Sequence, residues 1–193
     1  MKKKLIEFEK KIKDLYEKKV IKSPIHLSGN NENELIKIFK NIKKNDWVFS
    51  TWRNHYHALL HGITEIELLN QIISGKSMSI CSAKPKFYSS SIVGGILPIA
   101  VGVALSHKIK NIKNNVWVFI GDMTYETGVF HECHKYSIQN KLKIKFIVED
   151  NNMSTNTPTN KVWKKNTQKM KNVIKYKYTR KYPHHGTGNW VLF

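Results

Sequence analysis

The chain has 193 residues, and 40% of them are hydrophobic, which is typical of a globular protein and excludes a disordered one. Basic residues outnumber acidic ones by 33 to 14, and the formal net charge of +19 would suit a nucleic-acid or other anionic partner. All basic residues except Arg53 and Arg180 are lysines spread along the chain, however, which favours compositional drift over a dedicated nucleic-acid surface.

The spacing of apolar residues predicts a chain of alternating helices and strands. Helices are expected at 2–19, 32–44, 63–75, 97–107 and 128–140, and strands at 46–51, 116–120, 144–148 and 173–178. Thr64 and Glu67 form a capping box at the start of the third helix. Irregular segments are expected at 76–91, 155–171 and 182–188.

Neither a membrane nor an oxidising compartment is indicated by the sequence. The N-terminal residues MKKKLIEFEKK contain no uninterrupted apolar core, and the most apolar stretch, 92–105, is too short to cross a bilayer. Cys81 and Cys133 have no CxxC spacing, so neither a disulfide framework nor a zinc site is expected. We therefore expect a cytoplasmic protein with reduced cysteines and no membrane partner.

Polar residues follow the two most apolar predicted strands. Gly121 and Asp122 come directly after the strand at 116–120, and Asp150-Asn151-Asn152 follow the one at 144–148. A helix at 128–140 makes this a right-handed βαβ unit, which brings both strand ends to the ligand-binding edge of a parallel sheet. A carboxylate and a carboxamide meeting there suit Mg²⁺ that holds a phosphate ester.

These elements predict an α/β fold of three layers, α/β/α, around a mostly parallel sheet. We expect one domain over residues 1–193. Within it, 1–46 would form N-terminal helices, 47–156 the core with the binding site, and 157–193 a short C-terminal strand and loop.

Five motifs in order resemble one known family: SPIHLS (23–28), VFSTWRNHYHAL (48–59), SSIVGGILPIAVGVAL (90–105), GDMTYETGVFHE (121–132) and EDNNMS (149–154). Together they are similar to the alpha subunit of thiamine-diphosphate-dependent 2-oxoacid dehydrogenases. This is the decarboxylating component of the pyruvate, branched-chain and acetoin dehydrogenase complexes. The resemblance covers roughly residues 5–156, and it implies the thiamine-diphosphate-binding fold, thiamine diphosphate and Mg²⁺.

The resemblance assigns roles to individual residues. It implies that Asp122, Asn151 and the backbone carbonyl of Met153 bind Mg²⁺, and that Arg53 grips the diphosphate. The remaining positions that match cofactor contacts of the family are Ser91, Val93, Gly121, Met123, Thr124 and Glu126.

Three histidines match family positions around the reacting carbon. His26 and His55 align directly, and the third falls on His184 or His185, of which we take His185. Protonated imidazoles there would stabilise a substrate carboxylate and transfer protons. A packed, hydrogen-bonded histidine is the alternative for each of them. The histidines expected to be structural or on the surface are His57, His61, His107, His131 and His134.

Departures from the family pattern concern the cofactor turn and the C-terminal part. Met123 stands where the family has glycine, Ser79 stands where histidine is common, and the segment that follows Gly75 lacks the family's glycine-lysine repeats. Relatives also carry a long segment between the NN turn and the last strand that this chain mostly lacks. The chain is therefore expected to be a trimmed or an incompletely functional subunit.

The resemblance also implies partners. The family's activating glutamate lies on the pyrimidine domain of a beta-type subunit, so we expect a shared active site in an α₂β₂ heterotetramer, and a lipoyl-bearing acyltransferase as a further partner. Two alternatives stay open. One is a transketolase-like or carboligating enzyme that acts on sugars, and the other is a non-catalytic basic relative that binds nucleic acid.

Overall fold

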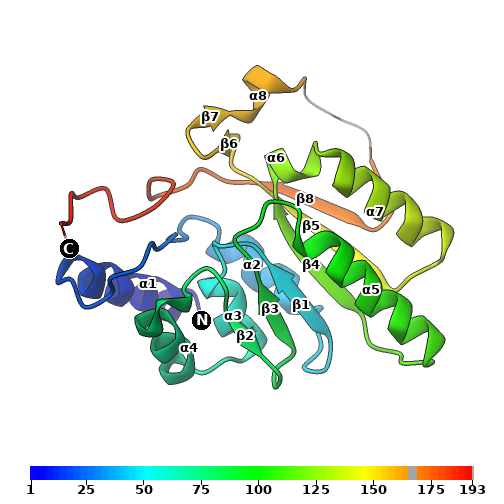
Figure 1. Ribbon diagram of the computed structural model, residues 1–193, viewed down its shortest axis with the longest axis horizontal. Coiled ribbons are helices and arrows are strands. Elements are labelled where there is room, and N and C mark those ends of the chain that lie inside the picture. The colour runs from blue at the N-terminus through cyan, green and yellow to red at the C-terminus, as the bar shows by residue number, and fades with distance from the viewer. Residues whose placement is uncertain (165–168, 193) are drawn as a thin grey trace.

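A six-stranded sheet forms the centre of the computed structural model, which describes residues 1–164 and 169–192 (Figure 1). The strand order is β2-β3-β1-β4-β5-β8, and every neighbouring pair is parallel except β2 with β3. The strands are β1 (Trp47–Ser50), β2 (Cys81–Ser82), β3 (Phe87–Ser89), β4 (Val116–Gly121), β5 (Ile144–Asp150) and β8 (Val173–Lys177). The predicted three-layer α/β fold with a mostly parallel sheet is confirmed.

Two helical layers cover the sheet (Figure 1). Alternate residues of β4 point to opposite faces: Phe119 packs into a core with the N-terminal helices, and Val118 into a core with α5 and α7. The helices are α1 (Lys2–Glu17), α2 (Glu32–Phe39), α3 (His55–His61), α4 (Glu65–Gln71) with the π-turn η1 (Ile72–Lys76), α5 (Ile96–Ile109), α6 (Asp122–Tyr125), α7 (Gly128–Gln139) and α8 (Thr159–Val162). None of the helices in the described residues is long and apolar enough to span a membrane.

Several predicted elements differ from the structure. The predicted helix at 32–44 ends at Phe39, and the WRNHYH stretch contains α3. The segment 76–91, expected to be irregular, contributes β2 and β3, because Phe87–Ser89 pairs with β1. The expected loop 155–171 contains the end of a short hairpin, β6 (Met153–Ser154) with β7 (Thr157–Pro158), followed by α8; its residues 165–168 lie outside the described chain.

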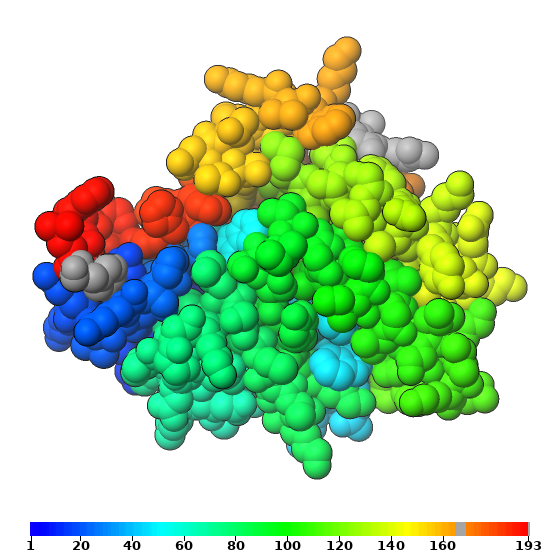
Figure 2. All heavy atoms as spheres, in the orientation of Figure 1, coloured from blue at the N-terminus to red at the C-terminus, as the bar shows by residue number. Residues whose placement is uncertain are grey.

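After β8 the chain returns to the N-terminal helices. The backbone N–H of Gly186 donates to the Ile25 carbonyl at 2.8 Å, which joins the two segments by an isolated bridge. The space-filling view shows the red C-terminal segment resting against the blue N-terminal one (Figure 2). The chain that follows β8 thus ends against the N-terminal segment (Figure 2). The predicted division of the chain into three segments, with boundaries at residues 46 and 156, stays a prediction.

Candidate functional site

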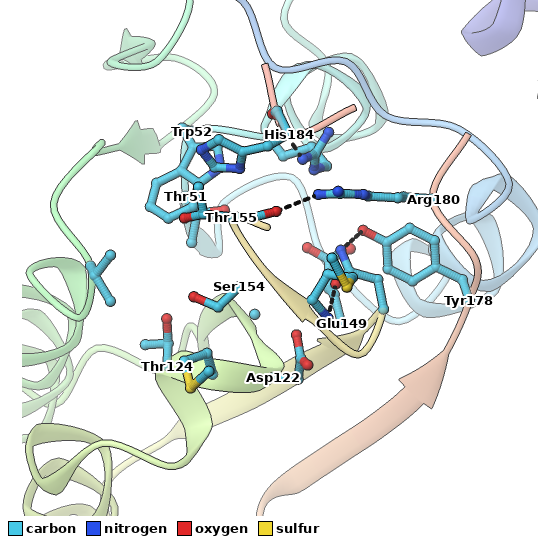
Figure 3. Close-up of a pocket in the computed structure, with 16 residues that line it drawn as sticks. Thr51, Trp52, Asp122, Thr124, Glu149, Ser154, Thr155, Tyr178, Arg180 and His184 are labelled. Atoms are coloured by element: carbon cyan, nitrogen blue, oxygen red, sulfur yellow. Dashed lines mark hydrogen bonds between the residues drawn. The ribbon is translucent and has the colours of Figure 1, made fainter. Parts of the chain in front are cut away.

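A pocket opens at the carboxyl ends of the central strands, and 16 residues line it (Figure 3). Gly121 at the end of β4 lies opposite Glu149 in β5, so the two strand ends meet as the sequence predicted. The predicted cofactor and metal residues that line this pocket are Arg53, Val93, Gly121, Asp122, Met123, Thr124, Asn151 and Met153.

Asp122 supplies a carboxylate with spare coordination capacity. It begins the single turn α6, its side chain is buried, and its Oδ2 atom has no hydrogen-bond partner among the described residues. Burial raises the pKa of Asp122; the nearby Thr159 hydroxyl opposes this shift, and the charge of Asp150 adds to it. A buried, unpaired oxygen of this kind costs stability, and a bound cation would offset that cost.

Asn151 and Met153 form the turn that follows β5. The Met153 N–H donates to Asn151 Oδ1 at 2.9 Å, and Asn151 Nδ2 donates to the Tyr178 hydroxyl at 3.2 Å. These bonds orient the carboxamide at the pocket. Within the described residues no cluster of three or more His, Cys, Asp or Glu side chains could hold a metal, so a Mg²⁺ site here would depend on amide and carbonyl oxygens beside Asp122.

Arg53 is held by two backbone carbonyls. Its Nη1 donates to Leu27, and its Nη2 donates to His184 at 3.3 Å. The side chain is buried at the pocket wall. Two of the predicted cofactor residues lie elsewhere: Ser91 is exposed outside the pocket, and Glu126 lines a neighbouring cleft that shares Asp122 with it.

The structure separates the three predicted catalytic histidines. His26 is buried, its Nδ1 lies 2.6 Å from the His184 carbonyl, and burial lowers the pKa of His26 to about 4. His55 is fully enclosed between Glu9 and Ser77 at 3.1 and 2.9 Å, away from the pocket. His184 lines the pocket, whereas His185 is exposed and does not. The catalytic roles of His26, His55 and His185 stay predictions.

A buried polar chain that the sequence did not reveal reaches the pocket through Glu149. Glu149 lines the pocket and accepts hydrogen bonds from His57 Nε2 at 3.3 Å, from Asn31 Nδ2 at 3.3 Å and from the Tyr176 hydroxyl. His57 Nδ1 in turn lies 2.7 Å from Ser50 Oγ. Burial alone would raise the pKa of Glu149, but His57 and Tyr176 outweigh it and lower that pKa, so the carboxylate is ionised at neutral pH.

Arg180 and Tyr178 are further pocket residues that sequence reasoning missed. Both follow β8: Tyr178 ends the strand predicted over 173–178, and Arg180 lies beyond it, where no apolar periodicity continues. The scarcity of arginine was the one available signal, because it singles out Arg180 as it does Arg53.

A family model described as the dehydrogenase E1 component matches residues 1–175. The alpha subunit of an acetoin:2,6-dichlorophenolindophenol oxidoreductase from Bacillus subtilis is 28% identical, over 78% of this chain and 48% of that protein. Pyruvate dehydrogenase E1 alpha subunits are 31% identical in Arabidopsis thaliana (chloroplastic alpha-3; 66% of this chain, 33% of the relative) and 28% in Rickettsia prowazekii (79% and 50%).

The chain thus spans half or less of the length of these relatives. The family match nevertheless extends over most of the chain and includes the pocket-lining residues of both the β4 and β5 ends. The chain belongs to the dehydrogenase E1 component family.

Proposed function

We propose that this chain binds Mg²⁺ and thiamine diphosphate and serves as the alpha-type subunit of an enzyme that decarboxylates a 2-oxo acid. The observation that carries the proposal is the buried, unpartnered Asp122 oxygen in a pocket that also holds Arg53. Thiamine diphosphate, when bound, supplies an electron sink for loss of CO₂ from a 2-oxo acid. The names of the relatives, which are acetoin and pyruvate enzymes, support this reaction class.

Different residues of the pocket would bind the cation and the anion. Asp122, Asn151 and the Met153 carbonyl would hold Mg²⁺ through hard oxygen ligands. Arg53 would bind a diphosphate oxygen, because the Leu27 and His184 carbonyls fix its guanidinium without neutralising it. Met123 also lines the pocket and is a bulkier neighbour for the diphosphate than the family's glycine.

A beta-type partner would complete the site. Among the described residues, the one carboxylate at the pocket besides Asp122 is Glu149, and it already accepts hydrogen bonds from His57 and Tyr176. Next to the pocket, Ile92, Val93 and Ile99 leave 67%, 54% and 46% of their surface exposed at the start of α5. An apolar surface beside an incomplete site suits a subunit interface. A lipoyl-bearing acyltransferase and a cytoplasmic location belong to the same proposal.

The first test is binding. Isothermal titration calorimetry with thiamine diphosphate and Mg²⁺ should show saturable binding by the full chain, and Asp122→Asn should weaken it at least roughly tenfold, since even outer-shell changes cost metal sites about 10- to 100-fold. Asp14→Asn, an exposed carboxylate on α1, is the matched control. Asp122→Asn should not lower the free energy of unfolding without ligand, because it removes the charge from a buried carboxylate whose Oδ2 atom has no hydrogen-bond partner in the described chain.

The second test is turnover. The chain co-expressed with a beta-type partner should decarboxylate at least one member of a 2-oxo acid panel, whereas the chain alone should not. Absence of cofactor binding, or turnover by the chain alone at the rate of the complex, would contradict the proposal. Cofactor binding with carboligation of sugars and without decarboxylation would favour the alternative enzyme class.

A further inference from the structure

Both arginines of the chain line the same pocket, although they lie far apart in the sequence. Arg53 follows β1 and Arg180 follows β8, the two strands being separated in the sheet by β4 and β5. Every other basic residue is a lysine. A planar guanidinium differs from an ammonium in that it can bind two oxygens of one anion at once.

Arg180 reaches into the pocket from the side opposite Asp122 (Figure 3). Its Nη1 donates to the backbone carbonyl of Thr155 at 3.0 Å, in the turn of the β6–β7 hairpin. That bond uses one of the five N–H groups of a guanidinium, so it orients the side chain and leaves most donors free. The Thr155 carbonyl therefore orients Arg180 and leaves the other N–H groups of its guanidinium available to a ligand.

Neither arginine of this pocket wall has a salt-bridge partner in the described chain, although the charge of Arg53 contributes to the lowered pKa of the nearby Glu149. Burial lowers the pKa of Arg180, and the neighbouring charge of Arg53 lowers it further. His184, which lines the same wall, gives its carbonyl to Arg53 and therefore does not neutralise the pair. An anion with several oxygens would be able to accept hydrogen bonds from both guanidiniums.

We propose that Arg180 is a second diphosphate-binding residue, which grips the anion jointly with Arg53 while the Asp122 side of the pocket holds the cation. This inference rests on the proposed function, because it assigns the anion to the cofactor's diphosphate. The β6–β7 hairpin would then have a role as well, because its Thr155 carbonyl would orient Arg180 toward the diphosphate. The C-terminal segment would thereby contribute a ligand-binding residue, Arg180, to the site.

The test uses the full chain and two ligands, thiamine diphosphate and inorganic diphosphate, each titrated calorimetrically with Mg²⁺ present. Arg180→Gln should weaken both ligands by roughly 10- to 100-fold, the usual effect of losing charge-assisted hydrogen bonds. Arg180→Lys should recover only part of this loss, because an ammonium keeps the charge and not the bidentate geometry. Lys181→Gln is the matched control, since it removes the same charge at the next residue, which is exposed and outside the pocket.

The outcomes separate the inference from the proposed function. If the unmodified chain binds both ligands and Arg180→Gln binds them as tightly as Lys181→Gln does, Arg180 is not a diphosphate residue and the proposed function stands. If the chain binds inorganic diphosphate in an Arg180-dependent way but not thiamine diphosphate, Arg180 is a diphosphate-binding residue, but the proposed cofactor, and with it the assignment of the anion to that cofactor, is wrong. Binding of neither ligand overturns both. Should Arg180→Gln fail to fold, Arg180→Lys decides: an affinity equal to that of the unmodified chain refutes the inference.

Discussion

His26 makes the stability of this fold depend on pH. Its ring is buried beside Trp52 and His184, and burial together with the charge of Arg53 lowers the pKa of His26 to about 4 from 6.5. The folded chain therefore keeps His26 neutral at a pH where the unfolded chain already binds a proton. Stability is complete above pH 6.5 and is lost progressively as the pH falls toward 4.

The size of the effect follows from the two pKa values. Their separation corresponds to about 3 kcal/mol in total, of which about 2 kcal/mol should be lost between pH 7.5 and pH 5. Urea unfolding monitored by circular dichroism at both pH values measures this loss. His26→Asn keeps a donor for the His184 carbonyl but cannot titrate, so the variant should lose about 2 kcal/mol less than the unmodified chain over the same interval. Equal losses for the two proteins would refute the assignment.

Two further substitutions test a buried charge and a close backbone contact near the pocket. Glu149→Gln should lower the free energy of unfolding at pH 7 by about 2 kcal/mol, because three donors lose a charged acceptor; a change below about 0.5 kcal/mol would mean that the carboxylate is not ionised in the fold. Gly94→Ala should cost about 1–3 kcal/mol in thermal unfolding, since its φ is +75° and a Cβ would lie 2.8 Å from Val129 Cγ1. Combining it with Val129→Ala should restore the part due to the clash, and no restoration would show that strain in φ accounts for the whole cost.

The central βαβ unit was predictable because local signals there agree with the fold. Val116 to Ile120 and Ile144 to Val148 are apolar runs that end in polar turns, and the structure buries them as neighbouring parallel strands. Phe87–Ser89 gave no comparable signal. It is short, contains a serine and a tyrosine, and owes its extended form to pairing with β1. Short strands of this kind are defined by tertiary contacts rather than by sequence pattern.

The same distinction applies to the site. Asp122 and Asn151 follow predictable strands, so their meeting at one pocket could be anticipated. Arg180 lies beyond β8, and its position depends on long-range bonds such as that to Thr155. His55 shows the opposite case: its motif resembles a catalytic segment, but Glu9 of α1 closes over the ring. No local pattern in the sequence indicates which distant helix will cover a side chain.

Opposite charge on the two sides of the pocket explains why one ligand should bring the cation and the anion together. Within the described chain, the Asp122 Oδ2 atom is buried without a hydrogen-bond partner, and the Arg53 and Arg180 guanidiniums line the same pocket without a salt-bridge partner. A lone anion would compensate the arginines and leave Asp122 charged and buried; a lone cation would do the reverse. A Mg²⁺–diphosphate pair would give Asp122 a cation and the two arginines an anion at the same time. Its binding free energy would therefore include the removal of two costs that the folded chain already carries, the buried carboxylate and the repulsion between the arginines.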